Sequence, residues 1–228
     1  MKGKPTRLAR RWPPEGILRR SANPLLIVGL CAAYAAFAVT FRGSRSAFWG
    51  RMTRTGLGLG TIPLVAEPSL RGLRPSRRSA GTGAASAAAL YAIFRLGDVM
   101  ARHIMPAGAE EITDIYQLRS LEPAGTIAAR LALVIGPAEE LFWRGFVQAR
   151  LRRRYGETIG TVLASAAYGG AHLVTGNATL VGAATVAGAY WGALCAAGAS
   201  MESLTASHVV WDILTFLVAP TAPVHPPA

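Results

Sequence analysis

Residues 139–144 read Glu-Glu-Leu-Phe-Trp-Arg, and they lie in a stretch that otherwise has the composition of a membrane-spanning helix. The preceding run, residues 127–138, carries only Arg130 as a charge. Ionisable side chains are costly at bilayer depth, and those that occur there usually face the interior of a helical bundle and serve a function. The two acids and the arginine therefore predict a functional site inside a membrane-embedded bundle.

The composition of the 228-residue chain favours lipid as its surrounding solvent. The chain is 51% hydrophobic and 16% charged, whereas soluble domains carry about 25% charged residues. Its net charge is +12, but the basic residues form clusters between apolar segments, which is typical of juxtamembrane loops. We therefore expect the lipid bilayer as a partner and no nucleic acid. The basic clusters are residues 2–20, 42–54, 71–78 and 150–154.

Seven apolar segments predict an all-α, polytopic transmembrane helical bundle. The segment 56–70 is short and Gly-rich and contains Pro63 and Glu67, so a re-entrant or interfacial piece is an alternative there. The segments are residues 24–41, 56–70, 80–105, 124–149, 158–175, 178–199 and 203–219.

The distribution of charge favours a cytoplasmic N-terminus in a bacterial cell membrane. With seven crossings, the basic clusters 71–78 and 150–154 both lie inside, as the positive-inside rule requires. The cluster 42–54 then lies outside, together with an acid-rich loop that holds Glu110, Glu111, Asp114 and Glu122. The abundance of Arg, Ala and Gly fits a bacterial source.

We divide the chain into four parts. They are a basic cytoplasmic N-terminal segment (1–23), N-terminal transmembrane helices and loops (24–122), a catalytic helical core (123–219) and a disordered tail (220–228). The basic start and the apolar residues 23–41 could also form a long signal peptide. The apolar run is longer than the usual secretory one and favours an uncleaved anchor.

Three polar motifs interrupt the later apolar segments. Residues four apart share one face of a helix, so the ends of each motif can meet. The motifs are Glu139-Glu140-x-x-x-Arg144, Tyr168-x-x-x-His172 and His208-x-x-x-Asp212.

Counting residues from the expected turn at Tyr155-Gly156 brings two of these motifs to one depth. Glu139 lies about 16 or 17 residues before the turn and His172 about as many after it. At about 1.5 Å per residue, both lie roughly 25 Å from the turn. His208 reaches this level only approximately. Pro137 is expected to loosen the helix just before the acids.

These residue types predict a hydrolase that activates water. Arg144 would compensate Glu140 and leave Glu139 as the general base, with His172 sharing the water proton. His208 could donate a hydrogen bond to a developing oxyanion. We expect no cofactor. A metal site formed by the two histidines and a glutamate is an alternative, although the sequence has no compact His-Glu-x-x-His motif.

In this order, the motifs resemble the CAAX prenyl protease and bacteriocin-processing (Abi) family of glutamate-type intramembrane endopeptidases. The resemblance covers about residues 124–219. It implies that Glu139 and His172 activate water and that His208 and Asp212 stabilise the oxyanion. Glu140 and Arg144 would organise the site.

Two positions depart from that family. Tyr168 stands where Phe is more usual, and Asp212 stands where the best-understood relatives have Asn. An ionised aspartate cannot donate a hydrogen bond. Asp212 is therefore either protonated or orients His208.

The sequence thus predicts a membrane-embedded endopeptidase that acts on a membrane-anchored or lipid-attached peptide. Prenylated CAAX substrates are not expected in a bacterial host. A non-catalytic immunity or scaffold protein of the same fold is one alternative. A proton-coupled transporter is another, because transporters also use intramembrane Glu and His. Trp143, Trp191 and Trp211 are expected to pack in the core or to anchor the protein at the headgroups.

Overall fold

The computed structural model describes residues 23–105 and 107–220, and the secondary structure in these ranges is entirely helical. The predicted all-α bundle is therefore confirmed. The predictions of a basic cytoplasmic segment and of a disordered tail fall mainly on residues 1–22 and 221–228, which lie outside the described residues.

Residues 124–155 form one continuous helical stretch, divided only by two wider π-helical turns. The elements in chain order are α1 (Pro24–Arg42), η1 (Arg45–Ala47), α2 (Phe48–Ala66), η2 (Pro68–Gly72), α3 (Arg77–Ile104), α4 (Gly108–Tyr116), η3 (Gln117–Leu121), α5 (Ala124–Arg130), η4 (Leu131–Ile135), α6 (Gly136–Glu140), η5 (Leu141–Gln148), α7 (Ala149–Tyr155), α8 (Glu157–Ala171), η6 (His172–Thr175), α9 (Ala178–Ala196), α10 (Met201–Ile213) and η7 (Leu214–Val218).

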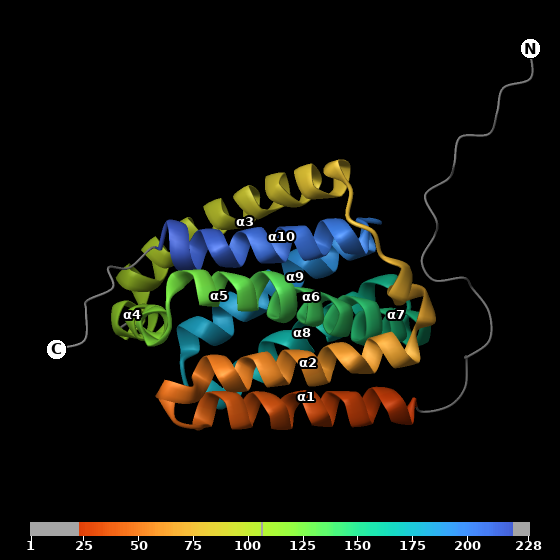
Figure 1. The fold of residues 1–228 in the computed structure, drawn as a ribbon, viewed down its shortest axis with the longest axis horizontal. Coiled ribbons are helices and arrows are strands. Elements are labelled where there is room, and N and C mark those ends of the chain that lie inside the picture. Colours follow the sequence, from red (N-terminus) through yellow and green to blue (C-terminus); the bar gives the residue numbers. More distant parts are fainter. Residues whose placement is uncertain (1–22, 106, 221–228) are drawn as a thin grey trace, which may run out of the picture.

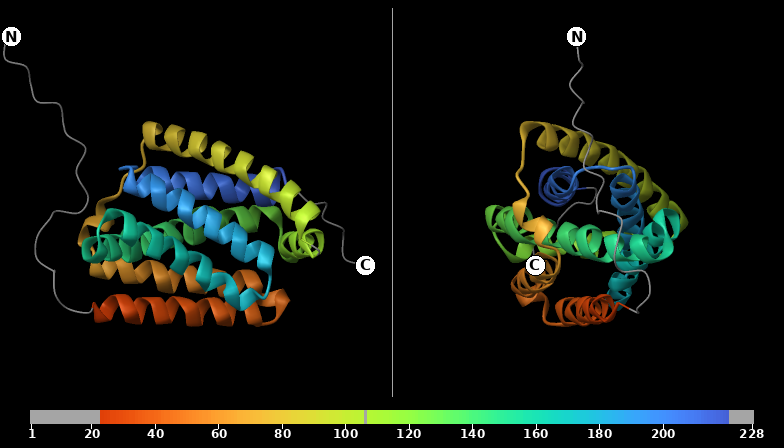
Figure 2. Two further views of the ribbon diagram at one scale, coloured as in Figure 1. Left: turned by 180° about the vertical axis from the view of Figure 1, so that it is seen from behind. Right: turned by 90° about the vertical axis from the view of Figure 1, so that its right-hand side faces the viewer.

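The long helices lie side by side and alternate in direction (Figure 1). α1, α2, α3, the helical stretch 124–155, α8, α9 and α10 each run between the two ends of the bundle, which Figure 2 shows from behind and end-on. α4 lies at one end and α7 finishes at the other. We call these the α4 end and the α7 end.

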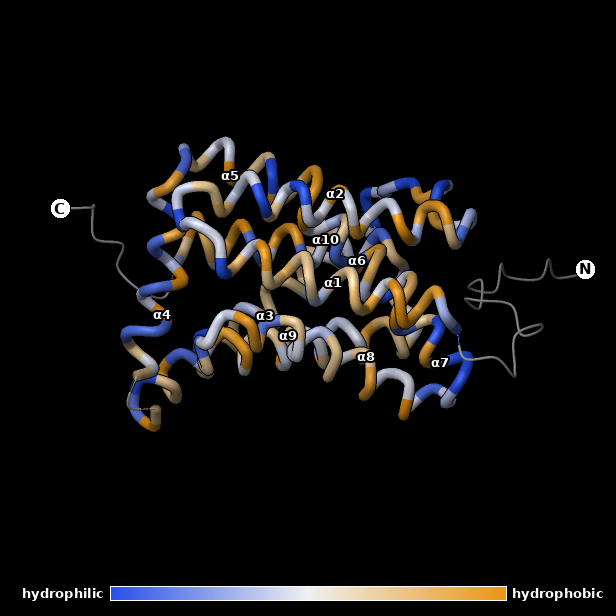
Figure 3. Tube along the Cα trace, turned by 90° about the horizontal axis from the view of Figure 1, so that it is seen from below, coloured by the Kyte–Doolittle hydropathy of each residue, from blue (hydrophilic) through white to orange (hydrophobic). Residues whose placement is uncertain are grey.

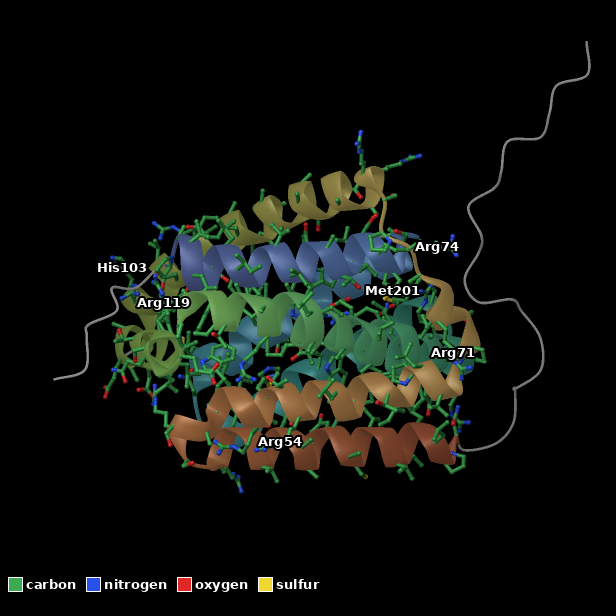
Figure 4. The ribbon with its side chains drawn as sticks, viewed as in Figure 1. Arg54, Arg71, Arg74, His103, Arg119 and Met201 are labelled. Atoms are coloured by element: carbon green, nitrogen blue, oxygen red, sulfur yellow. The ribbon has the colours of Figure 1, made fainter. Side chains whose placement is uncertain are left out.

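Three of the described helices, α1, α3 and α9, are long and apolar enough to cross a membrane. Hydrophilic residues gather at the two ends of the bundle, around α4 and α7 (Figure 3). The labelled Arg71 and Arg74 lie at the α7 end, whereas His103 and Arg119 lie at the α4 end (Figure 4). These features describe a membrane protein, and the number of seven crossings stays a prediction.

Two predicted boundaries near the N-terminus were wrong. Residues 56–66 of the segment 56–70 are the second half of the longer helix α2, which begins at Phe48, and the rest of the segment leads into η2. Arg51 and Arg54 therefore lie in a helix and not in a basic loop, and Arg54 is labelled in Figure 4. The guanidinium of Arg51 donates to the carbonyl oxygen of Thr40 at 3.1 and 3.2 Å, at the C-terminus of α1. Hydropathy alone misplaced the boundary because this arginine satisfies a backbone carbonyl near the C-terminus of α1, where carbonyls lack partners within the helix.

Pro137 changes the helix as the sequence predicted. It has no backbone N–H to donate, and the N–H of Gly136 bonds to the carbonyl of Leu131, five residues back. This is a π-helical turn, which often occurs at functional sites. A second π-helical turn follows at residues 141–148. The two acids of the first motif therefore lie on a short α-helical piece between two widened turns.

Small residues on α9 allow it to pack closely against α8. A Cβ atom at Gly188 would lie 2.9 Å from Tyr168 Cδ1, and one at Gly192 would lie 2.9 Å from Ser165 Oγ. Glycines four apart are a common device for close helix contact in membranes. The spacing brings the backbone of α9 to the edge of the polar motifs.

α3 packs on α10 through another glycine, and this contact provides a test of the fold. A Cβ atom at Gly83 would lie 2.5 Å from Ala206 Cβ and 2.9 Å from the carbonyl oxygen of Ser203. We expect Gly83→Ala to destabilise the protein by about 1–3 kcal/mol, because overpacking forces the helices apart. Gly81→Ala is the matched control, since nothing lies within 4 Å of its Cβ position. Thermal unfolding in detergent measures both, and equal melting temperatures would contradict the contact.

The predicted acid-rich loop contains a helix, α4, and Glu111 connects this helix to the start of α9. Its carboxylate accepts hydrogen bonds from Thr179 Oγ1 at 2.6 Å, from Thr179 N at 2.8 Å and from Ala178 N at 3.1 Å. A negative charge is also favourable at a helix N-terminus. The hydrogen bonds from Thr179 hold the pKa of Glu111 below its ordinary value.

This lowered pKa predicts a pH-dependent contribution of Glu111 to stability. The contribution is present above the pKa of the unfolded chain and is lost as the pH falls through the lower pKa of the folded state. We expect Glu111→Gln to lower the melting temperature at pH 7 and to have less effect in acid. The exposed neighbour Glu110 provides the control variant Glu110→Gln. A Glu111→Gln difference that is the same at both pH values would contradict the role of its charge.

Candidate active site

A buried carboxylate, Glu140, joins two of the polar motifs. Its Oε1 accepts a hydrogen bond from Arg144 Nη1 at 2.9 Å, and His208 Nδ1 lies 2.7 Å from the same oxygen. The exposed fractions are 0% for Glu140, 2% for Arg144 and 3% for His208. The predicted pair of Glu140 and Arg144 is present, and His208 from α10 completes a triad that crosses between helices.

Arg144 is also held by groups outside the triad. Its Nη2 donates to the carbonyl oxygen of Gly188 at 3.4 Å. The guanidinium carbon lies 4.8 Å from the ring centroid of Tyr168 and 5.3 Å from that of Trp191. Because a guanidinium has five N–H donors and a flat face, it can satisfy a carboxylate, a carbonyl and aromatic rings together.

Glu139 faces away from the triad into different surroundings. Its Oε2 accepts a hydrogen bond from the hydroxyl of Tyr168 at 2.8 Å, and the residue is 5% exposed. The hydroxyl that distinguishes Tyr168 from the more usual Phe thus has a partner. The two adjacent acids therefore differ in their surroundings: Glu140 is shared by two basic side chains, and Glu139 is held by a neutral donor.

His172 lies at the end of α8 in an aromatic environment. Its Nδ1 lies 3.0 Å from the carbonyl oxygen of Tyr168, which can only accept, so Nδ1 carries a proton. The rings of Phe37, Tyr168 and Phe41 surround the imidazole at centroid distances of 5.1, 5.3 and 5.9 Å. Among the described residues no hydrogen bond joins Glu139 to His172, but both contact Tyr168. In the neutral ring, Nε2 is the nitrogen that can accept a proton.

Asp212 lies close to the second nitrogen of His208. Its Oδ2 is 3.7 Å from His208 Nε2, which is beyond ordinary hydrogen-bond distance. The two ring nitrogens of His208 thus face different carboxylates, Glu140 at contact distance and Asp212 slightly farther away.

The structure brings the three motifs to one cavity of about 590 Å³. Glu139, Tyr168, His172, His208 and Asp212 all lie on its wall, whereas Glu140 and Arg144 lie behind it. The rest of the lining is mainly apolar and comes largely from α2, α3, α4, α9, α10 and η7. Large apolar residues in this lining include Trp49, Met52, Ile93, Phe94, Met100, Ile112, Tyr116, Val186, Trp211 and Phe216.

Two contributions to the site were missed in the sequence. Trp191, expected to pack or to anchor at the headgroups, is fully buried and stacks on His208 with a centroid distance of 4.0 Å. Phe37 and Phe41 of α1 lie against His172. The sequence signal for Trp191 is its place between Gly188 and Gly192, which marks a face of close helix contact. Phe37 and Phe41 are not flanked by glycines in this way, and the sequence did not indicate their contact with His172.

The described residues contain no cluster of three or more His, Cys, Asp or Glu side chains placed to hold a metal ion. Glu140, His208 and Asp212 lie near one another but are not placed as such a set. Glu140 is already bonded to Arg144.

Residues 123–214 match the family model of Type II CAAX prenyl endopeptidase Rce1-like proteins. No curated protein and no solved structure matches the chain. The match covers all three motifs and confirms the family resemblance over this part of the chain. By its description, the matched family is one of endopeptidases.

The buried triad predicts a large effect of removing its arginine. We expect Arg144→Met to destabilise the protein by about 3–5 kcal/mol, because it removes the cation from a buried carboxylate. Arg45→Met is the control, since Arg45 pairs with Asp114 and the two side chains are 44% and 57% exposed, and such pairs contribute about 0–1 kcal/mol. Unfolding in detergent measures both variants. Similar stability of the two would show that Glu140 does not depend on Arg144.

Proposed function

We propose that this protein is an intramembrane endopeptidase that hydrolyses a peptide bond of a membrane-anchored or lipid-attached protein or peptide. The observation that carries the proposal is one apolar cavity whose wall holds Glu139 and two histidines. Glu139 and both histidines belong to the segment, residues 123–214, that matches an endopeptidase family. The reaction is hydrolysis by water activated by Glu139 and His172, without a cofactor or metal ion.

The surroundings of Glu139 suit a general base. The hydroxyl of Tyr168 holds Oε2 and leaves Oε1 for a water molecule. The bond from His172 Nδ1 to the Tyr168 carbonyl leaves the lone pair of Nε2 for the same water. A single tyrosine thus orients both groups, one through its side chain and one through its backbone.

The proposed reaction proceeds by attack of the activated water on the peptide carbonyl. Glu139 takes one proton from water, and the oxygen of the resulting hydroxide bonds to the carbonyl carbon of the peptide. The carbonyl electron pair moves to its oxygen, which becomes the oxyanion. The oxyanion electron pair then re-forms the carbonyl as the C–N bond breaks, and the proton held by Glu139, directly or relayed through His172, passes to the leaving nitrogen. The products are a carboxylic acid and an amine, and the acid then gives its remaining proton to the amine or to solvent.

His208 is the proposed donor to the oxyanion. Its Nδ1–H is directed to Glu140, so donation to the substrate requires a proton on Nε2 as well. The nearby Asp212 carboxylate favours this doubly protonated ring, and at 3.7 Å it leaves the Nε2 proton available to a substrate oxygen. This assigns Asp212 the role of stabilising the charged form of His208 rather than of donating a hydrogen bond itself.

The cavity supports an apolar substrate. Side chains such as Trp49, Phe94 and Phe216 line it, and the polar groups are confined to the residues of the three motifs and few others. The apolar side chains of a peptide, or an attached lipid chain, would be buried there without leaving polar groups of their own unpaired.

We further propose that the N-terminus and the α7 end face the cytoplasm of a bacterial cell. Support comes from the basic residues at that end, where Arg150 and Arg153 pair with Glu67 and Arg152 pairs with Glu157. The α4 end, with the acidic residues of α4, then faces outward.

The test compares the membrane proteomes of cells that produce the wild-type protein, Glu139→Ala or His172→Ala. We expect a truncated membrane protein that is present with the wild type and absent with both variants, because loss of a general base costs about 10²–10⁴ in rate. Glu157→Gln, an exposed change at the α7 end, is the control and should leave the product unchanged.

Other outcomes identify the alternatives. Unchanged proteolysis in both variants would contradict the proposal. Full function of Glu139→Gln would favour a non-catalytic immunity or scaffold protein. Proton-coupled uptake into liposomes that is lost in the Glu139 variant would favour a transporter.

A further inference from the structure

Trp191 contacts two consecutive residues of α10 in two different ways. Its indole Nε1–H donates to Ser207 Oγ at 3.0 Å. Its ring lies against the imidazole of His208 with a centroid distance of 4.0 Å and an angle of 20° between the planes. A hydrogen bond fixes the plane of the indole, and the stacked face then restricts the plane of the imidazole.

The hydrogen bond of Trp191 is itself anchored in the protein. Ser207 Oγ lies 2.9 Å from Ser86 Oγ on α3, and Ser86 Oγ lies 3.1 Å from the hydroxyl of Tyr190. Trp191 and Ser207 are both fully buried. The indole is therefore held by a polar network that connects α3, α9 and α10, and packing alone does not determine its orientation.

His208 needs such a support because it lies on the wall of a large cavity. Its edge is held at Nδ1 by Glu140, but one hydrogen bond leaves the ring free to tilt toward the open side. The face of Trp191 removes this freedom. An aromatic face also attracts a cationic ring, which is the form that the proposed oxyanion donor requires.

We infer that Trp191 is a positioning residue for His208, holding the imidazole in the plane that keeps Nδ1 on Glu140 and Nε2 toward the cavity. The catalytic importance of this positioning rests on the proposed function. The effect of Trp191 on the orientation of the His208 ring does not depend on that proposal. A merely structural tryptophan would fill volume and leave the hydrogen bond of His208 unaffected.

The test observes the ring of His208 directly. The chain has four histidines, so imidazole ¹⁵N-labelled protein in detergent micelles gives few signals, and His208→Gln assigns the relevant one. The short contact of Nδ1 with a buried carboxylate predicts a downfield, slowly exchanging proton. We expect this signal to weaken in Trp191→Phe, which keeps an aromatic face but not the hydrogen bond to Ser207, and to be lost in Trp191→Leu.

The matched control is Phe146→Leu. Phe146 is also a fully buried aromatic residue, and it stacks on Phe142 with a centroid distance of 5.6 Å, away from His208. This variant should lose stability like Trp191→Leu but retain the His208 signal. If Trp191→Leu keeps the signal, or if Phe146→Leu loses it equally, the positioning role is wrong.

A kinetic measurement tests whether a misplaced His208 ring lowers the rate of peptide hydrolysis. The probe is an internally quenched palmitoylated peptide in liposomes, which represents the proposed lipid-attached substrate, with Glu139→Ala as the blank. A misplaced reacting group can cost about 10²-fold, and we expect Trp191→Leu to lower kcat to that extent with little change in KM. Partial recovery in Trp191→Phe distinguishes positioning from loss of packing.

The two readouts separate the two hypotheses. Cleavage that persists in Glu139→Ala would overturn the proposed function and leave the NMR result to decide the role of Trp191. Cleavage that depends on Glu139 but is unchanged in Trp191→Leu would overturn the inference alone. If the wild type does not cleave this peptide, the NMR measurement still decides it.

Discussion

The site depends on one buried oxygen, Glu140 Oε1, which contacts both Arg144 and His208. A carboxylate with no exposed surface is strongly destabilising unless it is paired and hydrogen-bonded. The two contacts supply this pairing at Oε1, whereas the buried Oε2 has no hydrogen-bond partner among the described residues. They also fix the orientation of α10 relative to α6. The same arrangement separates the roles of the two adjacent acids. Arg144 and His208 both contact Glu140. Glu139 therefore bonds only to Tyr168 among the described side chains and lies on the cavity wall.

The local parts of this arrangement could be predicted from the sequence. Helical spacing alone was enough to pair Glu140 with Arg144. The hairpin at Gly156, whose φ of +85° suits a glycine, was visible in the sequence, and it places Glu139 and His172 on one cavity. Pro137 also had the predicted effect, since a residue without an N–H must disturb the hydrogen bonds of its helix.

The parts that depend on contacts between distant helices could not be predicted in the same way. Counting residues from the turn before α10 gave only an approximate depth for His208. The sequence does not tell where that turn lies along the bundle axis relative to the turn at Gly156. Met201, the first residue of α10, lies beside Gly145, well before the end of the helix at Tyr155. His208 therefore reaches Glu140 after few residues of α10. The stack of Trp191 on His208 likewise follows from tertiary packing, which periodicity does not report.

The two halves of the chain contribute different parts of the site: one contributes the polar motifs, and the other contributes much of the apolar cavity wall. All seven residues of the motifs lie within residues 123–214, the part that matches the protease family. Much of the apolar wall comes instead from α2, α3 and α4, and α1 supplies the phenylalanines beside His172. On the proposed function, the N-terminal half therefore selects the substrate by the shape of its wall, while the matched segment supplies the acid, base and oxyanion groups. A change on α3 that faces the cavity, such as one at Phe94, would alter which apolar group fits without touching Glu139 or either histidine. The N-terminal half thus forms part of the cavity wall, so on the proposed function it does more than anchor the protein in the membrane.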